Sequence, residues 1–313
     1  MSNVNIIVGP PGTGKTTTLL NLLDEYLGKG ISPKDVGYIS FTVKAADEAK
    51  SRATERFGFR KDELPWFRTL HSLAFRWLRL DTKMIMKRQH YSQICEKLGI
   101  EYSGFMVMDE GVMLPGGYAG DRMLFQEGLA RVRMISLEEQ YNRSTEDFSL
   151  SELSRLKGTL EAYKDSYSLM DFNDMLTLML AEKNLPHFKV LFIDEAQDLS
   201  RLQWAVVHKL IANSEQVYIA GDDDQAIFAW AGADPDSFIK MPGNVTTLAK
   251  SYRLPKAVHR LSEAVIRGIS NRRPKDFSSR DEEGLVSFVS DISDIDMSQG
   301  DWLILARNKY LLN

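Results

Sequence analysis

The sequence contains very little cysteine and little histidine. Its 313 residues include one cysteine, Cys95, and five histidines. A single thiol excludes an intramolecular disulfide, a cysteine-based zinc site and an iron–sulfur cluster. Cys95 lies within a helical pattern at residues 91–98, so we expect it to be a small side chain of the core.

Long apolar runs and targeting segments are also missing. The sequence has no apolar run long enough to span a bilayer and no signal-peptide pattern at its start. We therefore expect a soluble, cytoplasmic protein with no membrane partner. The net charge is −4, which argues against a protein coated in nucleic acid but is compatible with a local binding groove.

Short apolar runs alternate with helical patterns along most of the chain. The composition is that of an ordinary globular protein, with 43% hydrophobic residues. Continuous apolar runs are what a parallel sheet covered on both faces requires. The predicted fold class is therefore α/β. The expected strands of its parallel sheet lie at residues 4–8, 36–41, 190–193, 217–220 and 245–248.

The middle of the chain differs in character from the segments on either side. Residues 1–80 and 150–275 carry the α/β pattern and are predicted to form one domain. Residues 81–149 lack alternating strands and are predicted to be an inserted, mostly helical subdomain. Five glycines and one proline fall within residues 104–121, which are therefore expected to form a mobile loop.

The last part of the chain carries a weaker pattern. Residues 270–275 have the composition of a linker. Residues 276–313 then hold two expected strands, at 285–289 and 302–306. Because two strands do not make a stable domain, we expect this end to be the incomplete start of a second domain.

A glycine-rich loop follows the first expected strand. It reads Gly-Pro-Pro-Gly-Thr-Gly-Lys-Thr and fits the pattern of a phosphate-binding loop. Glycines allow backbone N–H groups to surround a polyphosphate, and the N-terminus of the following helix adds a favourable dipole. Lys15 would place an ammonium on the outer phosphates, and the Thr16 hydroxyl would hold Mg²⁺. The alternative is a chance glycine turn. The residues predicted to bind ATP here are Gly9, Pro10, Gly12, Thr13, Gly14, Lys15, Thr16 and Thr17.

Two acidic residues, Asp194 and Glu195, directly follow the expected strand at 190–193. In open α/β sheets ligands bind beyond the carboxyl ends of the strands, so both carboxylates should meet the phosphates. One would orient Mg²⁺, and the other would position or deprotonate the water that attacks the γ-phosphate. An acidic pair at a helix N-terminus is the alternative interpretation.

A second polar loop, Gly-Asp-Asp-Asp-Gln, follows the strand at 217–220 and makes Gln225 a candidate sensor of the γ-phosphate. The aspartates alone are compatible with a solvated turn. Two aromatic residues, Phe228 and Trp230, come next. They are either core residues or a stacking platform for unpaired bases, which contributes about 1–3 kcal/mol per base.

The order of these blocks resembles superfamily 1A DNA helicases of the UvrD/Rep/PcrA type. The similarity runs from residue 4 to about residue 273 and is less clear towards residue 313. The Gly-Asp-Asp-Asp-Gln and Ser-Tyr-Arg blocks in this order are highly specific for that family. The resembling blocks are residues 9–16, 40–46, 69–73, 169–176, 192–198, 221–230 and 251–253.

The resemblance implies a RecA-like P-loop NTPase domain and roles for single residues in ATP hydrolysis. Asp194 would serve the metal and Glu195 the hydrolytic water. Gln225 would couple the γ-phosphate to DNA, and Arg253 would act like an arginine finger. Tyr252 would stack on the adenine, although it is equally compatible with an ordinary core tyrosine.

The resemblance also implies an interface for single-stranded DNA. Aromatic side chains would pack against bases, and His71 would lie near the DNA backbone. A histidine at a helix start with a satisfied ring is the alternative for His71. The residues expected at this interface are Phe41, Thr42, His71, Phe228 and Trp230.

The sequence departs from the family pattern at several places. Thr17 and Ala231 stand where the family often has arginine, and we expect the adenine-reading glutamine motif, which precedes the phosphate loop in the family, to be absent. The later motifs of the second motor domain are also expected to be absent. A chain of this kind would bind nucleotide but hydrolyse it poorly by itself.

The leading hypothesis is the N-terminal motor half of an ATP-dependent DNA helicase of DNA repair or replication. It would move along single-stranded or 3′-tailed DNA, in the 3′-to-5′ direction that the resemblance implies, and would need a second motor domain in cis or from a partner. The alternatives are a nucleotide-gated single-strand-binding module, the motor part of a helicase–nuclease subunit, and a small-molecule kinase.

Overall fold

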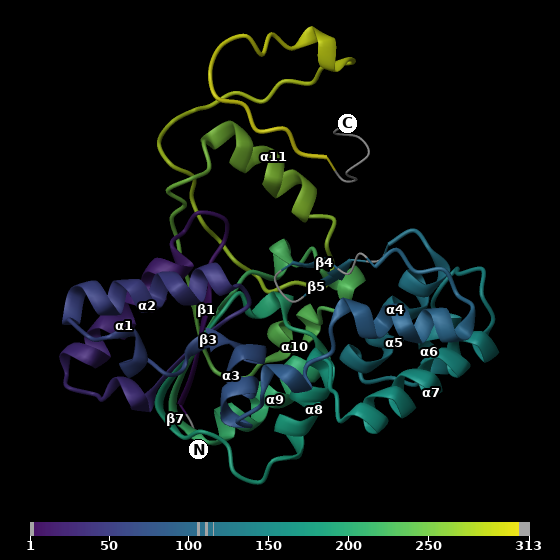
Figure 1. The fold of residues 1–313 in the computed structure, drawn as a ribbon. Helices are drawn as coiled ribbons and strands as arrows, with labels where there is room; N and C mark the ends of the chain where they lie inside the picture. Colours follow the sequence, from purple (N-terminus) through teal and green to yellow (C-terminus); the bar gives the residue numbers. More distant parts are fainter. Residues whose placement is uncertain (1–2, 105–106, 110–111, 115, 307–313) are drawn as a thin grey trace.

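A six-stranded sheet forms the centre of the structure (Figure 1), with the strand order β3-β2-β6-β7-β1-β8. All neighbouring strands in it are parallel. The computed structural model describes residues 3–104, 107–109, 112–114 and 116–306. The predicted α/β class and the five predicted strands are confirmed. The strands are β1 (Asn3–Val8), β2 (Val36–Ser40), β3 (Phe67–Thr69), β6 (Phe188–Asp194), β7 (Ser214–Gly221) and β8 (Asn244–Thr247).

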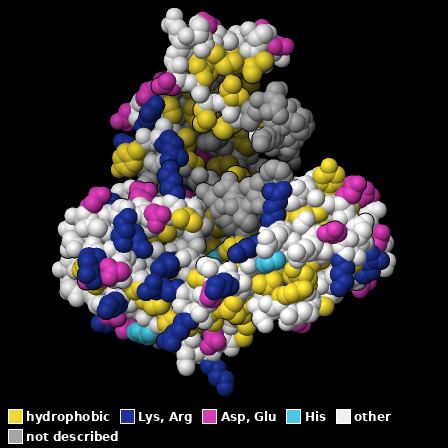
Figure 2. All heavy atoms as spheres, viewed as in Figure 1, with side chains coloured by type: hydrophobic (Ala, Val, Ile, Leu, Met, Phe, Trp, Pro, Cys, Tyr) yellow, Lys and Arg dark blue, Asp and Glu magenta, His cyan; other side chains and the backbone are white. Residues whose placement is uncertain are grey.

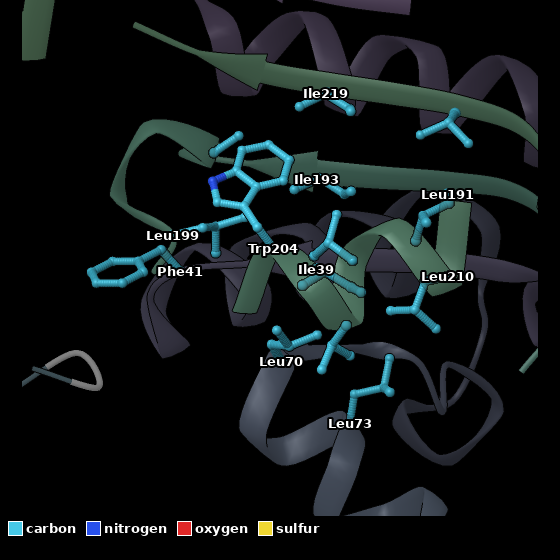
Figure 3. Close-up of a cluster of buried hydrophobic side chains, with 14 of the residues drawn as sticks. Ile39, Phe41, Leu70, Leu73, Leu191, Ile193, Leu199, Trp204, Leu210 and Ile219 are labelled. Atoms are coloured by element: carbon cyan, nitrogen blue, oxygen red, sulfur yellow. The ribbon is translucent and has the colours of Figure 1, made fainter. Parts of the chain in front are cut away.

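Helices cover both faces of the sheet because successive side chains of a buried strand point in opposite directions. In β6, Leu191 and Ile193 enter one core with Trp204, whose ring lies beside Ile193 in Figure 3. Val190 and Phe192 enter the core on the other face. The first core lies under α3 (Leu70–Trp77), α8 (Phe172–Ala181), α9 (Arg201–Ala212) and α10 (Pro235–Lys240), and the second under α1 (Lys15–Gly28) and α2 (Val43–Phe57).

A helical unit lies beside the sheet and has a core of its own. Cys95 is fully buried in this core, as predicted, together with Ile94. Leu153 and Leu156 belong to the same core, although the prediction placed residues from 150 onwards in the α/β domain. The division into domains stays a prediction, and this packing favours a boundary after α7. The helices are α4 (Arg88–Leu98), α5 (Ala119–Val132), α6 (Leu137–Asn142) and α7 (Leu150–Tyr167).

The predicted loop at 104–121 contains regular structure. Strands β4 (Val107–Asp109) and β5 (Val112–Leu114) pair antiparallel, and α5 already begins at Ala119. Residues 105–106, 110–111 and 115 of that predicted loop lie outside the described residues.

The segment after α11 (Lys256–Ile266) differs from its prediction. No strand is present at 285–289 or 302–306, so that expectation is wrong for the part of the chain that the structure describes. A strand needs a neighbour for its backbone N–H and C=O groups, and these stretches have no strand beside them. Most of their side chains are exposed, with Phe288 86% accessible, and Figure 2 shows hydrophobic atoms gathered on this segment. Residues 307–313 of the predicted second domain lie outside the described residues.

No helix within the described ranges is both long and apolar enough to cross a membrane.

Candidate nucleotide site and nucleic-acid interface

Three loops meet at one edge of the sheet. They follow β1, β7 and β6, which are neighbours in the order β6-β7-β1. Because these strands are parallel, residues 9–16, 221–225 and 194–198 emerge at the same edge. The backbone N–H of Gly9 donates to the carbonyl of Gly221 at 3.0 Å, which fixes the first loop against the second.

The loop at 9–16 has the shape of an anion cradle. Gly14 precedes α1 with a φ of 85°, and no described side chain caps the helix or places an acidic group in its first turn. The first N–H groups of α1 are therefore available to an anion. Lys15 Nζ donates to the Gly9 carbonyl at 3.0 Å. A Cβ at Gly9 would lie 1.9 Å from Lys15 Cγ, so only glycine admits this lysine conformation.

Asp194 is a buried carboxylate directed at the loop. Thr16 Oγ1 donates to its Oδ2 at 2.9 Å, and the Tyr38 hydroxyl donates to the same oxygen at 3.2 Å. Burial and the neighbouring Glu195 carboxylate raise the pKa of Asp194 to about 6. A divalent cation would offset this unfavourable negative charge.

The donors fit Mg²⁺ rather than an ion held by many side chains. Mg²⁺ is usually bound by one or two protein oxygens together with phosphates and water. Thr16 and Asp194 offer two oxygen ligands beside the phosphate loop. The described residues contain no cluster of three or more His, Cys, Asp or Glu side chains suited to a metal.

Glu195 is held beside Lys15 by an unusual backbone. Its φ is 52°, in the left-handed region that non-glycine residues rarely adopt. Its Oε2 lies 3.9 Å from Lys15 Nζ and accepts from Gln197 Nε2 at 3.0 Å. The carboxylate is about one-third exposed, so a water molecule has access to it.

Gln197 connects the acidic loop to the loop after β7. Its Oε1 accepts from the backbone N–H of Asp222 at 3.0 Å, while its Nε2 holds Glu195. Gln225 Nε2 in turn donates to Asp222 Oδ2. The sequence reasoning gave Gln197 no role, although its place between two loop carboxylates in the block at 192–198 was a usable signal.

The Ser-Tyr-Arg block lies on the phosphate loop. The Tyr252 N–H donates to the Gly12 carbonyl at 2.9 Å, and Ser251 Oγ donates to the Pro11 carbonyl at 2.7 Å. A Cβ at Gly12, where φ is 71°, would lie 2.2 Å from Arg253 Cβ. The Tyr252 side chain is 72% exposed and is not a core tyrosine. Thr17 is exposed near the start of α1.

Aromatic side chains from both units line a cavity of about 200 Å³. The Phe41 and Phe228 rings lie 5.8 Å apart, and the His71 ring lies edge-on to Phe172 at 5.6 Å. All four line the cavity. Phe41 is largely buried, and Figure 3 shows its ring at the margin of the apolar cluster. Three of the residues predicted to bind DNA therefore meet at one site.

The remaining two predicted residues lie outside that lining. Trp230 is 46% exposed and packs at 6.3 Å on the ring of Phe125, which does line the cavity. Thr42 accepts from the Ala45 N–H and so caps α2. Phe125 and Phe172 were not predicted. Phe172 stands in the block at 169–176, where an aromatic residue at the expected start of a helix was the available signal.

His71 is neutral at physiological pH. Burial lowers its pKa to about 4, although the Asp171 carboxylate opposes this shift. Any contact of His71 with a DNA phosphate would therefore be a neutral hydrogen bond and not an ion pair.

A parallel sheet with this phosphate loop after β1 and an acidic pair at the end of β6 defines a RecA-like P-loop nucleotide-binding domain. Residues 1–246 match the UvrD/REP helicase N-terminal domain family, and the chain belongs to that family. The suspected resemblance is thereby confirmed.

Several curated proteins are similar to the chain. It is 25% identical over 298 residues to the ATP-dependent DNA helicase PcrA of Bacillus subtilis (strain 168), covering 90% of this chain and 40% of that protein. It is 25% identical over 295 residues to PcrA of Staphylococcus aureus (strain Mu50), covering 86% and 39%. It is 26% identical over 302 residues to PcrA of Staphylococcus epidermidis, covering 86% and 39%. The chain thus spans about two fifths of the length of these relatives.

Proposed function

We propose that the chain is the N-terminal motor half of an ATP-dependent DNA translocase or helicase. The observation that supports this most is the course of one short loop. It leaves β7 at the nucleotide site with Gln225 and reaches the aromatic cavity at Phe228, three residues later. A shift of this loop on nucleotide binding would therefore reach the proposed DNA interface directly.

The nucleotide chemistry is assigned to four side chains. The Lys15 ammonium would bind the β- and γ-phosphates, and Glu195 would orient the attacking water and accept its proton. Thr16 and Asp194 would hold Mg²⁺, which when bound supplies charge neutralisation at the phosphates. Gln225, fixed by Asp222, would sense the γ-phosphate.

The DNA substrate is assigned to the cavity and its margin. Phe41, Phe172 and Phe228 offer ring faces or edges to unpaired bases, and Trp230 lies next to them. Stacking of this kind contributes about 1–3 kcal/mol per base and does not depend on sequence. Preference for 3′-tailed DNA and movement in the 3′-to-5′ direction are proposed by likeness to the family.

A second motor domain would complete the nucleotide cleft. Arg253 and Tyr252 lie on one side of the phosphate loop, and the exposed apolar residues of 285–305 need a partner surface. We propose that further chain, in cis or from a partner, covers them. Without it the chain would act as a nucleotide-gated module for single-stranded DNA with little turnover, which is the second candidate function.

ATP turnover with and without single-stranded DNA, at a stated salt concentration, separates these functions. The expected result is binding of both ligands by the chain, with slow turnover until the second domain is added. Binding of neither ATP nor single-stranded DNA would contradict the proposal.

A further inference from the structure

A lysine from the predicted linker is buried among three carboxylates. Lys275 Nζ lies 2.6 Å from Asp222 Oδ1, 2.7 Å from Asp223 Oδ1 and 3.0 Å from Asp224 Oδ2. Its side chain has no exposed surface. Burial alone would lower the pKa of Lys275, but the Asp222 carboxylate and its neighbours raise it, so the lysine stays charged.

A second cation completes this group, which we call the linker clamp: Asp222, Asp223, Asp224, Arg272 and Lys275. Arg272 binds Asp224 with both Nε and Nη2, at 2.8 and 2.6 Å. The linker clamp therefore opposes two cations to three carboxylates. Loss of either cation would leave buried negative charge without compensation, which is strongly unfavourable.

Within the linker clamp, Lys275 alone of the two cations contacts Asp222. Asp222 is fully buried and holds Gln225 through its other carboxylate oxygen. Its backbone N–H is held by Gln197, which also binds Glu195. Lys275 therefore holds the side chain of a residue that contacts Gln225 directly and is linked to Glu195 through Gln197.

The segment that carries Lys275 also contacts the Ser-Tyr-Arg block. The Ser251 N–H donates to the Ser278 carbonyl at 2.8 Å, and the Arg280 N–H donates to the Leu254 carbonyl at 3.0 Å. Residues 272–280 are therefore attached to both sides of the nucleotide site. Movement of this segment would change the position of both sides together.

We propose that Lys275 is a positioning residue for γ-phosphate recognition: through Asp222 it holds Gln225 in place and ties the sensor loop to the segment at 272–280. This inference rests on the proposed function, because it assumes that Gln225 senses the γ-phosphate.

The test is the preference of the chain for ATP over ADP. It is measured as the dissociation constant for ADP divided by the dissociation constant for a non-hydrolysable ATP analogue. Lys275→Met should lower this ratio about tenfold, as expected for loss of a hydrogen bond to a charged group. ADP affinity should change less than about twofold, since the phosphate loop itself is untouched. Gln225→Ala should lower the ratio by the same factor.

Two further variants separate positioning from loss of stability. Arg272→Met removes a cation from the same clamp without a direct contact to Asp222, and it should keep the wild-type ratio. Lys275→Met combined with Asp223→Asn restores the charge balance of the clamp. If Lys275→Met alone does not fold, this double variant should fold, as judged by circular dichroism, and still show the lowered ratio.

An unchanged ratio in folded Lys275→Met or in the double variant, with a lowered ratio in Gln225→Ala, would overturn this inference alone. An equal loss in Arg272→Met would also overturn it, because the effect would then belong to the charge of the clamp. A wild-type chain that does not distinguish ATP from ADP would overturn the inference together with the proposed sensor role of Gln225.

Discussion

Gly12 is the contact point between the phosphate loop and the Ser-Tyr-Arg block, and Gly12→Ala is the sharpest test of that contact. The backbone there has a φ of 71°, and an added Cβ would lie 2.2 Å from Arg253 Cβ and 3.0 Å from the Arg253 nitrogen. The nearest atoms are Cβ and backbone, which cannot rotate away. The block must therefore move off the loop.

The cost can be divided into two parts. Placing alanine in the left-handed region costs about 1–2 kcal/mol. Moving the block breaks the bonds from Tyr252 to Gly12 and from Ser251 to Pro11, each contributing about 0.5–1.5 kcal/mol. We expect the free energy of unfolding to fall by about 2–5 kcal/mol and ATP affinity to fall at least about tenfold.

Gly30→Ala is the matched control. Gly30 has a φ of 83°, and a Cβ there would meet nothing within 4 Å. It should therefore show the backbone strain of about 1–2 kcal/mol in urea unfolding and no change in ATP affinity. If Gly12→Ala and Gly30→Ala lose equal stability and both keep wild-type ATP affinity, the block does not bear on the nucleotide site.

Three further predictions concern the site itself. Lys15→Ala should abolish ATP binding in a nucleotide titration, because the ammonium at the phosphates is lost; normal affinity would refute the phosphate-loop assignment. Trp230→Ala should weaken single-stranded DNA binding by about 1–3 kcal/mol in fluorescence anisotropy, and unchanged affinity would make Trp230 a packing residue only. Mg²⁺-dependent ATP affinity should rise between pH 5 and 7, because Asp194, with a pKa of about 6, must lose its proton to bind the metal. Since this folded pKa lies above the usual carboxyl value, Asp194 should also make the fold less stable as pH rises from about 4 to about 6, and Asp194→Asn should flatten both profiles.

The strands and the phosphate loop were predictable because their signals are local. Apolar runs such as 190–193 are buried on both faces, and their carboxyl ends can be aligned without knowing any side-chain contact. The prediction of strands at 285–289 and 302–306 was wrong because a strand also needs a non-local signal. Apolar alternation alone does not make a strand, because its hydrogen-bond partner has to come from elsewhere.

The contacts that hold the loops together could not be predicted from sequence patterns. Lys275 lies 53 residues from Asp222 in the chain, inside a segment whose composition indicates a solvated linker. Phe172 on α8 and Phe125 on α5 line the same cavity, although the two helices belong to different units and lie far apart in the sequence. Such long-range pairings depend on the tertiary fold and produce no periodic pattern in the amino-acid sequence.

The central claim is that the nucleotide site and the aromatic cavity are coupled through the loop from Asp222 to Trp230. The affinity of the chain for single-stranded DNA, measured with ADP and with a non-hydrolysable ATP analogue at one salt concentration, tests it most directly. We predict dissociation constants that differ at least about fivefold between the two nucleotides, with the difference lost in Gln225→Ala. Equal DNA affinity with both nucleotides, each shown to be bound, would contradict the account.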